Sequence, residues 1–168
     1  MFASCMSTIL INFKQKKMEI IIRRATHADL NAIHDLVRDL AVYEKAENEF
    51  IATIEEYERD FSNSVFQAIV AEMDNQVVGM ALYYVAYSTW KGKMLFLEDF
   101  VVKETHRRYG LGQKLFDAFL DEARLQGCRM VKWQVLDWNE PALRFYRKNE
   151  AIIEEGWWNG KIFFVENF

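Results

Sequence analysis

Residues 97–112, LEDFVVKETHRRYGLG, constrain the fold of this chain more than any other stretch. An apolar segment of strand character carries two acids, and a basic turn spaced by glycines follows it. From Gly110 onward, apolar side chains recur at helical spacing until Gly127, which is placed to end a helix. The stretch therefore predicts a strand, a tight basic turn and a helix in direct succession, as in proteins that mix strands and helices.

The remaining pattern extends this prediction to the whole chain. Strands are expected over residues 19–25, 65–72, 77–87, 93–102, 129–136, 152–155 and 161–165. Helices are expected over residues 27–45, 53–62, 110–126 and 141–148, with Thr26 or a residue within one or two of it as the first cap. Hairpins come first, and a strand–helix–strand crossover comes in the middle. This order predicts an α/β fold, with a mixed, mostly antiparallel twisted sheet and helices on both faces.

Length and composition limit the classes of protein to which the chain can belong. Its 168 residues fit one domain, and 51% hydrophobic with 27% charged residues argue against disorder and against a membrane protein. A net charge of −4 offers no basic surface for nucleic acid, and two cysteines make neither a disulfide framework nor a metal motif. The lysines of residues 1–17 follow the apolar part, the reverse of a signal peptide. We expect residues 1–17 to be an N-terminal extension and residues 18–168 to be a single domain of a cytoplasmic protein.

The basic turn is a candidate anion site. A helix N-terminus presents several N–H groups and a positive dipole end, and phosphates need both. Gly110 and Gly112 let the backbone approach an anion closely, and Arg107 and Arg108 add positive charge. A solvent-facing turn with glycines for a tight bend is the alternative. The strand directly before the turn and the helix directly after it favour the anion site.

The two acids of the strand are candidates for proton transfer. Strand alternation predicts that Glu98 and Asp99 point to opposite faces, which excludes a paired-carboxylate site and a two-ligand metal site. The neighbours expected on the face of Glu98 are Met94, Phe96, Phe100 and Val102. Apolar neighbours favour the protonated carboxyl and suit a base that works near neutrality. Glu98 could instead be satisfied by the backbone or a nearby lysine, and Asp99 could contact a substrate or anchor a loop.

Several stretches between residues 43 and 158 carry a resemblance to a known family. They are YEKAE, ALYYVAYSTWKGK, LEDFVVKETHRRYGLG, VLDWNEPALRFY and EEGWW. Together they resemble the GNAT N-acetyltransferase superfamily, and within it the diamine acetyltransferases. Where spermidine/spermine enzymes carry Asp-Pro before the loop tryptophan, this chain has Ser88-Thr89. The missing acid makes the chain more similar to the thialysine enzymes and favours a short amine over a long polyamine.

The resemblance implies a GNAT-like acyltransferase fold and acetyl-CoA as the cofactor. It implies that the strand backbone pairs with the pantetheine arm, that the glycine turn holds the diphosphate, and that the later helix also lines the cofactor. The cofactor-binding residues implied are Phe100, Val101, Val102, Arg107, Arg108, Tyr109, Gly110, Leu111, Gly112, Gln113, Asn139 and Tyr146.

The resemblance also implies the catalytic residues and the acceptor site. Glu98 takes a proton from the ammonium group, through water, and Tyr146 donates to the departing thiolate. Tyr146 could alternatively be one more aromatic on an amphipathic helix, and each acid of the acceptor site an ordinary exposed one. The substrate-binding residues implied are Tyr43, Glu44, Trp90, Glu98, Asp99, Glu155 and Trp157.

These expectations combine into one hypothesis. The chain transfers an acetyl group from acetyl-CoA to a primary amine of a small aliphatic molecule, by direct attack in a ternary complex. The expected partners are the small amine and a second copy of the chain in a homodimer, with no nucleic acid, membrane or metal. A protein or peptide acetyltransferase and a non-catalytic acyl-CoA-binding module are the alternatives.

Overall fold

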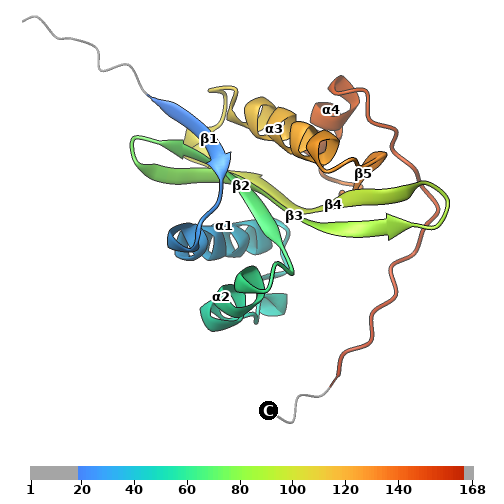
Figure 1. Cartoon of the computed structure of the whole chain (residues 1–168), viewed down its shortest axis with the longest axis horizontal. Helices are drawn as coiled ribbons and strands as arrows, with labels where there is room; N and C mark the ends of the chain where they lie inside the picture. The colour runs from blue at the N-terminus through green and yellow to red at the C-terminus, as the bar shows by residue number, and fades with distance from the viewer. Residues whose placement is uncertain (1–18, 165–168) are drawn as a thin grey trace, which may run out of the picture. The chain divides into compact units, whose positions relative to one another are not determined.

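The computed structural model describes residues 19–164, which form two compact units. One unit ends at Trp133 and the other begins at Gln134. Each is described by itself, and Figure 1 labels their elements. The prediction for residues 1–17 lies outside the described part of the chain, and the single domain over 18–168 stays a prediction.

The first unit contains the whole sheet. Its strands are β1 (Ile20–Arg24), β2 (Gln67–Met73), β3 (Gln76–Ser88), β4 (Gly92–Val102) and β5 (Met130–Trp133). They lie side by side in chain order; the first four are antiparallel to their neighbours and β5 is parallel to β4. The predicted mixed, mostly antiparallel α/β sheet is confirmed.

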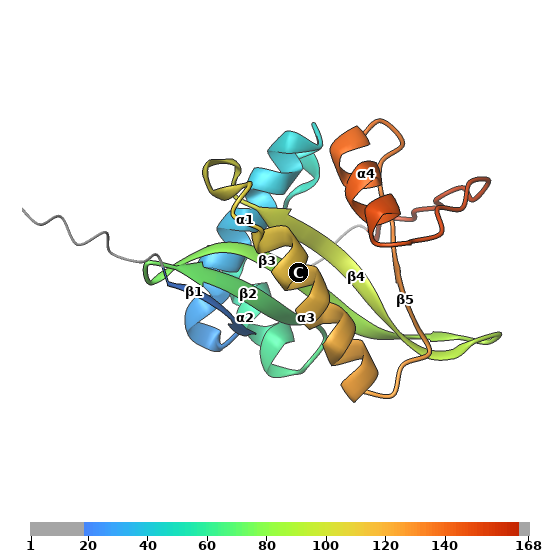
Figure 2. The ribbon, with the colours of Figure 1, turned by 90° about the horizontal axis from the view of Figure 1, so that it is seen from above.

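Helices cover both faces of the sheet, as predicted. α1 (Leu30–Tyr43) and α2 (Ile54–Ser62) lie on one face, and α3 (Leu111–Leu125) crosses the strands on the other (Figures 1 and 2). Three short 3₁₀ turns occupy His27–Asp29, Glu47–Glu49 and Glu104–His106, and α4 (Glu140–Lys148) belongs to the second unit. Within residues 19–164 no helix combines the length and the apolar character that a membrane span needs.

The apolar faces of these elements form the core. Leu30, Ile33 and Leu36 of α1 recur at helical spacing, are fully buried, and pack against Met80 and Leu82 of the sheet. On the opposite face, the ring of Tyr83 lies 5.6 Å from the ring of Phe119 on α3. Successive residues of β3, such as Leu82 and Tyr83, therefore face different helices.

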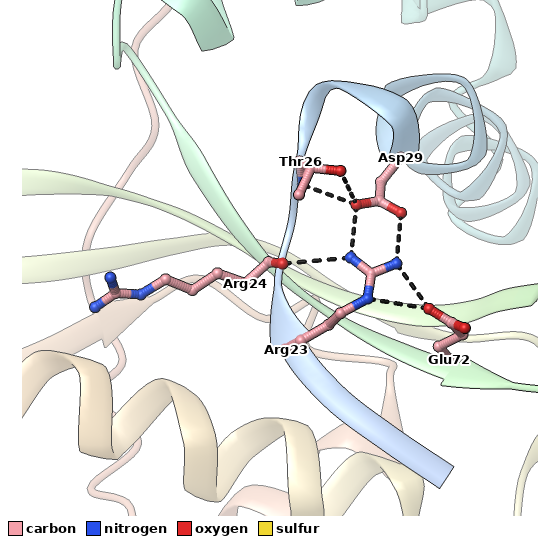
Figure 3. Close-up of polar contacts among 5 residues, drawn as sticks. All are labelled: Arg23, Arg24, Thr26, Asp29 and Glu72. Atoms are coloured by element: carbon pink, nitrogen blue, oxygen red, sulfur yellow. Dashed lines mark hydrogen bonds and ion pairs between the residues drawn. The ribbon is translucent and has the colours of Figure 1, made fainter. Parts of the chain in front are cut away.

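An ion-pair network ties β1 to the start of α1. Figure 3 shows the Arg23 guanidinium between the carboxylates of Asp29 and Glu72, with Nη1 2.7 Å from Asp29 and Nη2 2.7 Å from Glu72. The Thr26 backbone N–H also donates to Asp29, at 2.7 Å. These hydrogen bonds, the Arg23 pair first, lower the pKa of the buried Asp29 to about 2. The predicted cap at Thr26 thus precedes a 3₁₀ turn, and α1 starts three residues later than expected.

The predicted final strand pair is wrong for the described residues. Residues 151–164 form neither helix nor strand, and β5 ends at Trp133 instead of residue 136. A strand needs a neighbour that pairs with its backbone, and neither 152–155 nor 161–164 has one in the described chain. Ile152, Ile162 and Phe163 consequently remain exposed. Residue 165 lies outside the described range.

Candidate active site

The pairing of β3 with β4 contains a β-bulge at Glu98. Leu82 lies opposite Asp99, and the next residue, Tyr83, lies opposite Leu97. Glu98 is therefore an extra residue in β4 with no partner in β3. One extra residue interrupts the alternation of side chains between the two faces of a strand.

This bulge overturns the prediction that alternation separates the two acids. Leu82 belongs to the core under α1, so its partner Asp99 lies on that face of the sheet. Both acids line one pocket of about 380 Å³ between α2 and the sheet. We call it the acidic pocket; its lining residues are Ala52, Glu56, Tyr57, Asp60, Phe66, Leu82, Glu98 and Asp99. The strand supplies a pair of neighbouring carboxylates after all.

Asp99 is the more buried member of this pair. Burial, followed by the negative charges of Glu98 and Glu44, raises the pKa of Asp99 to about 7. The Asp99 carboxyl makes no hydrogen bond or ion pair with any other residue among 19–164. A largely buried carboxyl without a partner, close to half-protonated at neutral pH, is available to accept a proton or bind a cation.

Glu98 does not lie in the apolar surroundings predicted for it. The residue is exposed, and Phe100, expected beside it, faces the other side, with its ring 5.9 Å from that of Phe116 on α3. Its neighbour is instead Tyr84. Burial, and then the negative charge of the nearby Glu98 carboxylate, raise the pKa of Tyr84. The sequence argument therefore predicted the more buried position for the wrong acid of the pair, and proton transfer by this segment stays a prediction.

Two further residues are brought to the same place. Glu44 follows α1 directly, and its burial raises its own pKa while its charge acts on Asp99. Tyr57 of α2 lines the acidic pocket, and burial, then Asp99 and Glu98, raises its pKa to about 12. Sequence analysis predicted Glu44 and missed Tyr57. A tyrosine within the otherwise polar stretch TIEEYERDFS was the available signal.

The backbone of β4 is open on one side of the acidic pocket. β5 pairs with β4 only over Met94 to Leu97, so residues 98–102 have no strand neighbour on that side in the described chain. A strand edge without a strand neighbour can pair with an extended amide-containing ligand as it would with another strand. Phe100, Val101 and Val102, predicted to bind the pantetheine arm, lie in this open segment.

The turn before α3 has the form expected of an anion site. Gly110 precedes α3 with φ +75°, and no side chain caps the first turn of the helix. A Cβ at Gly110 would meet nothing within 4 Å, so the left-handed backbone, not lack of space, favours glycine. Arg107 and Arg108 are exposed beside the uncapped N–H groups. The open strand and this turn together fit the amide arm and the phosphates of coenzyme A.

Arg107 connects this turn with the end of α1. Its guanidinium carbon lies 5.8 Å from the centre of the Tyr43 ring, and its Nε donates to the Val102 carbonyl at 3.2 Å. A cation over an aromatic ring is attracted by the ring's electrons. Tyr43, predicted for the acceptor, and Arg107, predicted for the cofactor, are therefore direct neighbours.

Trp90 lies away from the acidic pocket. It is exposed in the turn between β3 and β4, beyond the Ser88–Gly92 pair. That pair lies five residues from Tyr83 along β3, which corresponds to about 17 Å of strand. Its predicted place in the acceptor site stays a prediction.

Four predicted site residues belong to the second unit. Tyr146 is buried on α4, with its ring 5.5 Å from that of Phe145. The Asn139 side chain accepts from the Ala142 N–H at 3.2 Å and so caps α4. Glu155 and Trp157 are exposed in the segment without regular structure. Their predicted roles at the cofactor and the acceptor remain predictions.

Comparisons with known proteins agree with this geometry. The chain is 35% identical over 151 residues to the thialysine N-epsilon-acetyltransferase of Bos taurus, covering 82% of this chain and 89% of that protein. It is 32% identical over 145 residues to the enzyme of the same name from Caenorhabditis elegans, covering 84% and 89%. The fold matches an aminoglycoside N-acetyltransferase solved in complex with CoA, with a TM-score of 0.69 at 16% identity over 91% of this chain and 98% of that one. Residues 30–150 match the Acetyltransferase (GNAT) family, and the chain is an N-acetyltransferase that belongs to this family.

Proposed function

We propose that the protein transfers the acetyl group of acetyl-CoA to a primary amine of a small aliphatic molecule, such as thialysine, a lysine-like compound or a short diamine. The observation that carries this proposal is the double role of residues 98–102. Their side chains Glu98 and Asp99 line the acidic pocket, while their backbone is open to a ligand on the β5 side. The relatives named as thialysine acetyltransferases support an amine acceptor.

The residues divide the chemistry among them. When bound, acetyl-CoA supplies the thioester carbonyl that an amine attacks. An aliphatic ammonium has a pKa of about 10, so Glu98 accepts its proton, through water, before the nitrogen becomes nucleophilic. A backbone N–H near Phe100 or Val101 donates to the carbonyl oxygen as negative charge develops there. Tyr146 donates a proton to the sulfur when the carbon–sulfur bond breaks.

The cofactor would be held by backbone and charge together. Residues 100–102 pair with the amide arm, and the turn over residues 107–113 binds the diphosphate through its N–H groups and arginines. A protein with the same fold was solved in complex with CoA, which supports CoA as the ligand. Attack occurs directly, with both substrates bound at once.

The protein would act as a cytoplasmic homodimer. The β3–β4 hairpin extends beyond the rest of its unit's sheet (Figure 2), and Val85, Tyr87 and Trp90 on it are exposed. Exposed aromatic side chains of this kind are common at subunit contacts. Light scattering of the purified protein measures the mass of the assembly, and a monomer at micromolar concentration would remove this part of the proposal.

A panel of acceptors tests the reaction itself. The protein is incubated with acetyl-CoA and thialysine, lysine, cadaverine, putrescine, spermidine or a lysine-containing peptide, and thiol release is followed. We expect the small amines to exceed spermidine and the peptide in kcat/KM. Preference for the peptide would identify a protein acetyltransferase, and tight CoA binding without turnover would identify a binding module.

A further inference from the structure

A histidine of α1 contacts two residues that line the acidic pocket. His34 is half-buried, and its Nε2 lies 3.0 Å from the backbone carbonyl oxygen of Ala52. Its ring meets the ring of Tyr57 edge-on, at 5.1 Å between centres, and lies 4.8 Å from the ring of Phe50. Ala52 and Tyr57 belong to the pocket lining, and His34 does not. His34 therefore supports this part of the lining, which we call the Ala52–Tyr57 wall, from behind.

The contacts of His34 determine which ring nitrogen carries the proton. A backbone carbonyl only accepts hydrogen bonds, so Nε2 is protonated and donates to Ala52. The Nη2 of Arg38 only donates, and it lies 3.3 Å from Nδ1, which therefore accepts. Both nitrogens of the neutral ring are thus used, and together they fix the orientation of the ring against Tyr57.

The helix that carries Tyr57 is held by half-buried side chains. Among the nine residues of α2 none is fully buried. Ile54, Tyr57 and Phe61 are partly buried and pack against the core under α1. Phe61 meets the ring of His27 edge-on, at 5.0 Å, but does not line the pocket. A short helix with so little buried surface is displaced at low cost, so the position of Tyr57 depends on contacts such as that with His34.

The Ala52–Tyr57 wall faces the more buried acid of β4. Burial is the first cause that raises the pKa of Tyr57, and the charges of Asp99 and Glu98 come next, so both acids lie near its phenol. Burial is likewise the first cause that raises the pKa of Asp99. Because Tyr57 and Asp99 line the same pocket, moving Tyr57 away from β4 would admit water to the Asp99 carboxyl.

We infer that His34 is a positioning residue, which holds Ala52 and Tyr57 over the acidic pocket and thereby limits the access of water to Asp99. The inference rests on the proposed function where it concerns catalysis, because that function places the amine in this pocket. A wall held at one distance from β4 keeps the acceptor nitrogen close to the carboxylates, and a displaced wall lets it move away.

Unfolding by urea as a function of pH tests the access of water to Asp99 without any turnover. His34→Ala removes both the hydrogen bond to Ala52 and the contact with Tyr57. We expect this variant to reduce by about half the loss of stability that Asp99 causes between pH 4 and pH 8, because a hydrated carboxyl ionises closer to its ordinary pKa.

The experiment is performed as a cycle, in the wild type and in the Asp99→Asn background. The difference between the backgrounds isolates the contribution of Asp99 and cancels the proton uptake of His34 itself. It also cancels the neighbouring groups that both backgrounds share. Those facing Asp99 are Glu44, Glu98, Tyr57, Glu56 and Asp60, and those facing His34 are Arg38, Glu55 and Tyr57.

Two further variants keep the test specific. His34→Gln retains an N–H that can donate to Ala52, so it should recover most of the Asp99 contribution. His27→Ala is the matched control and should leave that contribution unchanged, because it removes an edge-on histidine contact at Phe61, outside the pocket lining. If His34→Ala does not fold, His34→Phe, which keeps a ring and loses the donor, replaces it.

Either of two results would overturn the inference. One is a His34→Ala protein that keeps the whole Asp99 contribution. The other is a His34→Gln protein that behaves like His34→Ala, because the hydrogen bond to Ala52 would then hold nothing in place.

Kinetics separate this inference from the proposed function. If small amines are acetylated, His34→Ala should raise the KM for thialysine several-fold and leave the calorimetric affinity for CoA unchanged, and His34→Gln should stay close to the wild type. An unchanged KM, or an equal loss of CoA affinity, would disprove the positioning role alone. If no amine is acetylated, the proposed function fails, and the unfolding cycle still decides whether His34 limits the access of water to Asp99.

Discussion

Asp99 lies opposite Leu82 in the β3–β4 ladder. The following pair is Tyr83 with Leu97, so uninterrupted pairing would place Glu98 opposite Leu82. The extra residue, Glu98, turns Asp99 toward α1 and α2 and buries the Asp99 carboxyl near Glu98 and Glu44. The same change of register leaves Glu98 exposed at the mouth of the acidic pocket. One inserted residue therefore determines which carboxyl is buried and which is reached by solvent.

Asp99→Asn should stabilise the protein at alkaline pH. The pKa of Asp99 rises on folding from its usual 3.8 to about 7, so the folded state binds the proton more tightly and wild-type stability falls as pH rises between these values. The full difference corresponds to about 4 kcal/mol as an upper limit. We expect urea unfolding to show the variant more stable than the wild type at pH 8 and similar to it at pH 4.

Asp74→Asn is the matched control for this experiment. Asp74 is exposed in the β2–β3 turn with φ +50°, a conformation that asparagine adopts readily. The Asp74→Asn substitution should leave the pH dependence of unfolding unchanged. A wild-type protein whose stability does not fall between pH 4 and pH 8 relative to Asp99→Asn would show that Asp99 ionises without a penalty.

Glu98→Gln should move the optimum of the reaction rate to higher pH. Without a proton acceptor, the acceptor amine must reach the site already deprotonated, and the free amine becomes abundant only toward its pKa of about 10. The measurement is the pH profile of kcat/KM for cadaverine. An unchanged profile in Glu98→Gln, with a shifted profile in Asp99→Asn, would assign the proton acceptor to Asp99.

The fold was predictable from the sequence because its signals are local. The periodicity of residues 30–43 and 111–125, the turn at Asp74-Asn75, and Gly127 after α3 each act within a few residues. The bulge at Glu98 has no such signal, since it arises from how β4 pairs with β3, and it reversed the predicted burial of the two acids. The acidic pocket likewise depends on where α2 packs, which is why Tyr57 was missed. The strands predicted over residues 152–155 and 161–165 are absent from the described residues, because apolar sequence alone provides no pairing partner.

Gly110→Ala should weaken CoA binding. The glycine has φ +75° with open space around its Cα, so alanine fits but strains the backbone by about 1 kcal/mol or more. Relief of this strain would rotate the N–H groups proposed to bind the diphosphate. Gly127→Ala is the control, because Gly127 has φ +68° and equally open space at the other end of α3. Both variants should lose similar stability, and only Gly110→Ala should bind CoA several-fold more weakly by calorimetry.

Asp29→Asn should destabilise the protein near neutral pH. Pairing with Arg23 lowers the pKa of Asp29 from 3.8 to about 2, so its contribution is present above pH 4 and is lost as pH falls through 2. We expect a loss of up to about 2 kcal/mol at pH 7, which shrinks below pH 3. Asp35→Asn provides the comparison, because the Asp35–Arg38 pair is exposed and should contribute little. Equal losses from both variants would mean that burial adds nothing to the Arg23 network.

Tyr146→Phe should lower kcat and leave CoA binding nearly unchanged. The proposed role uses only the phenolic proton, and phenylalanine keeps the ring that lies buried on α4 beside Phe145. Loss of a proton donor at the leaving group costs on the order of 10² in rate or more. Tyr87→Phe, on the exposed part of the β3–β4 hairpin, removes a hydroxyl without touching the proposed chemistry and should keep its kcat. Full activity of Tyr146→Phe would remove Tyr146 from the mechanism, and a parallel loss of CoA affinity would show that its hydroxyl serves binding and not proton transfer.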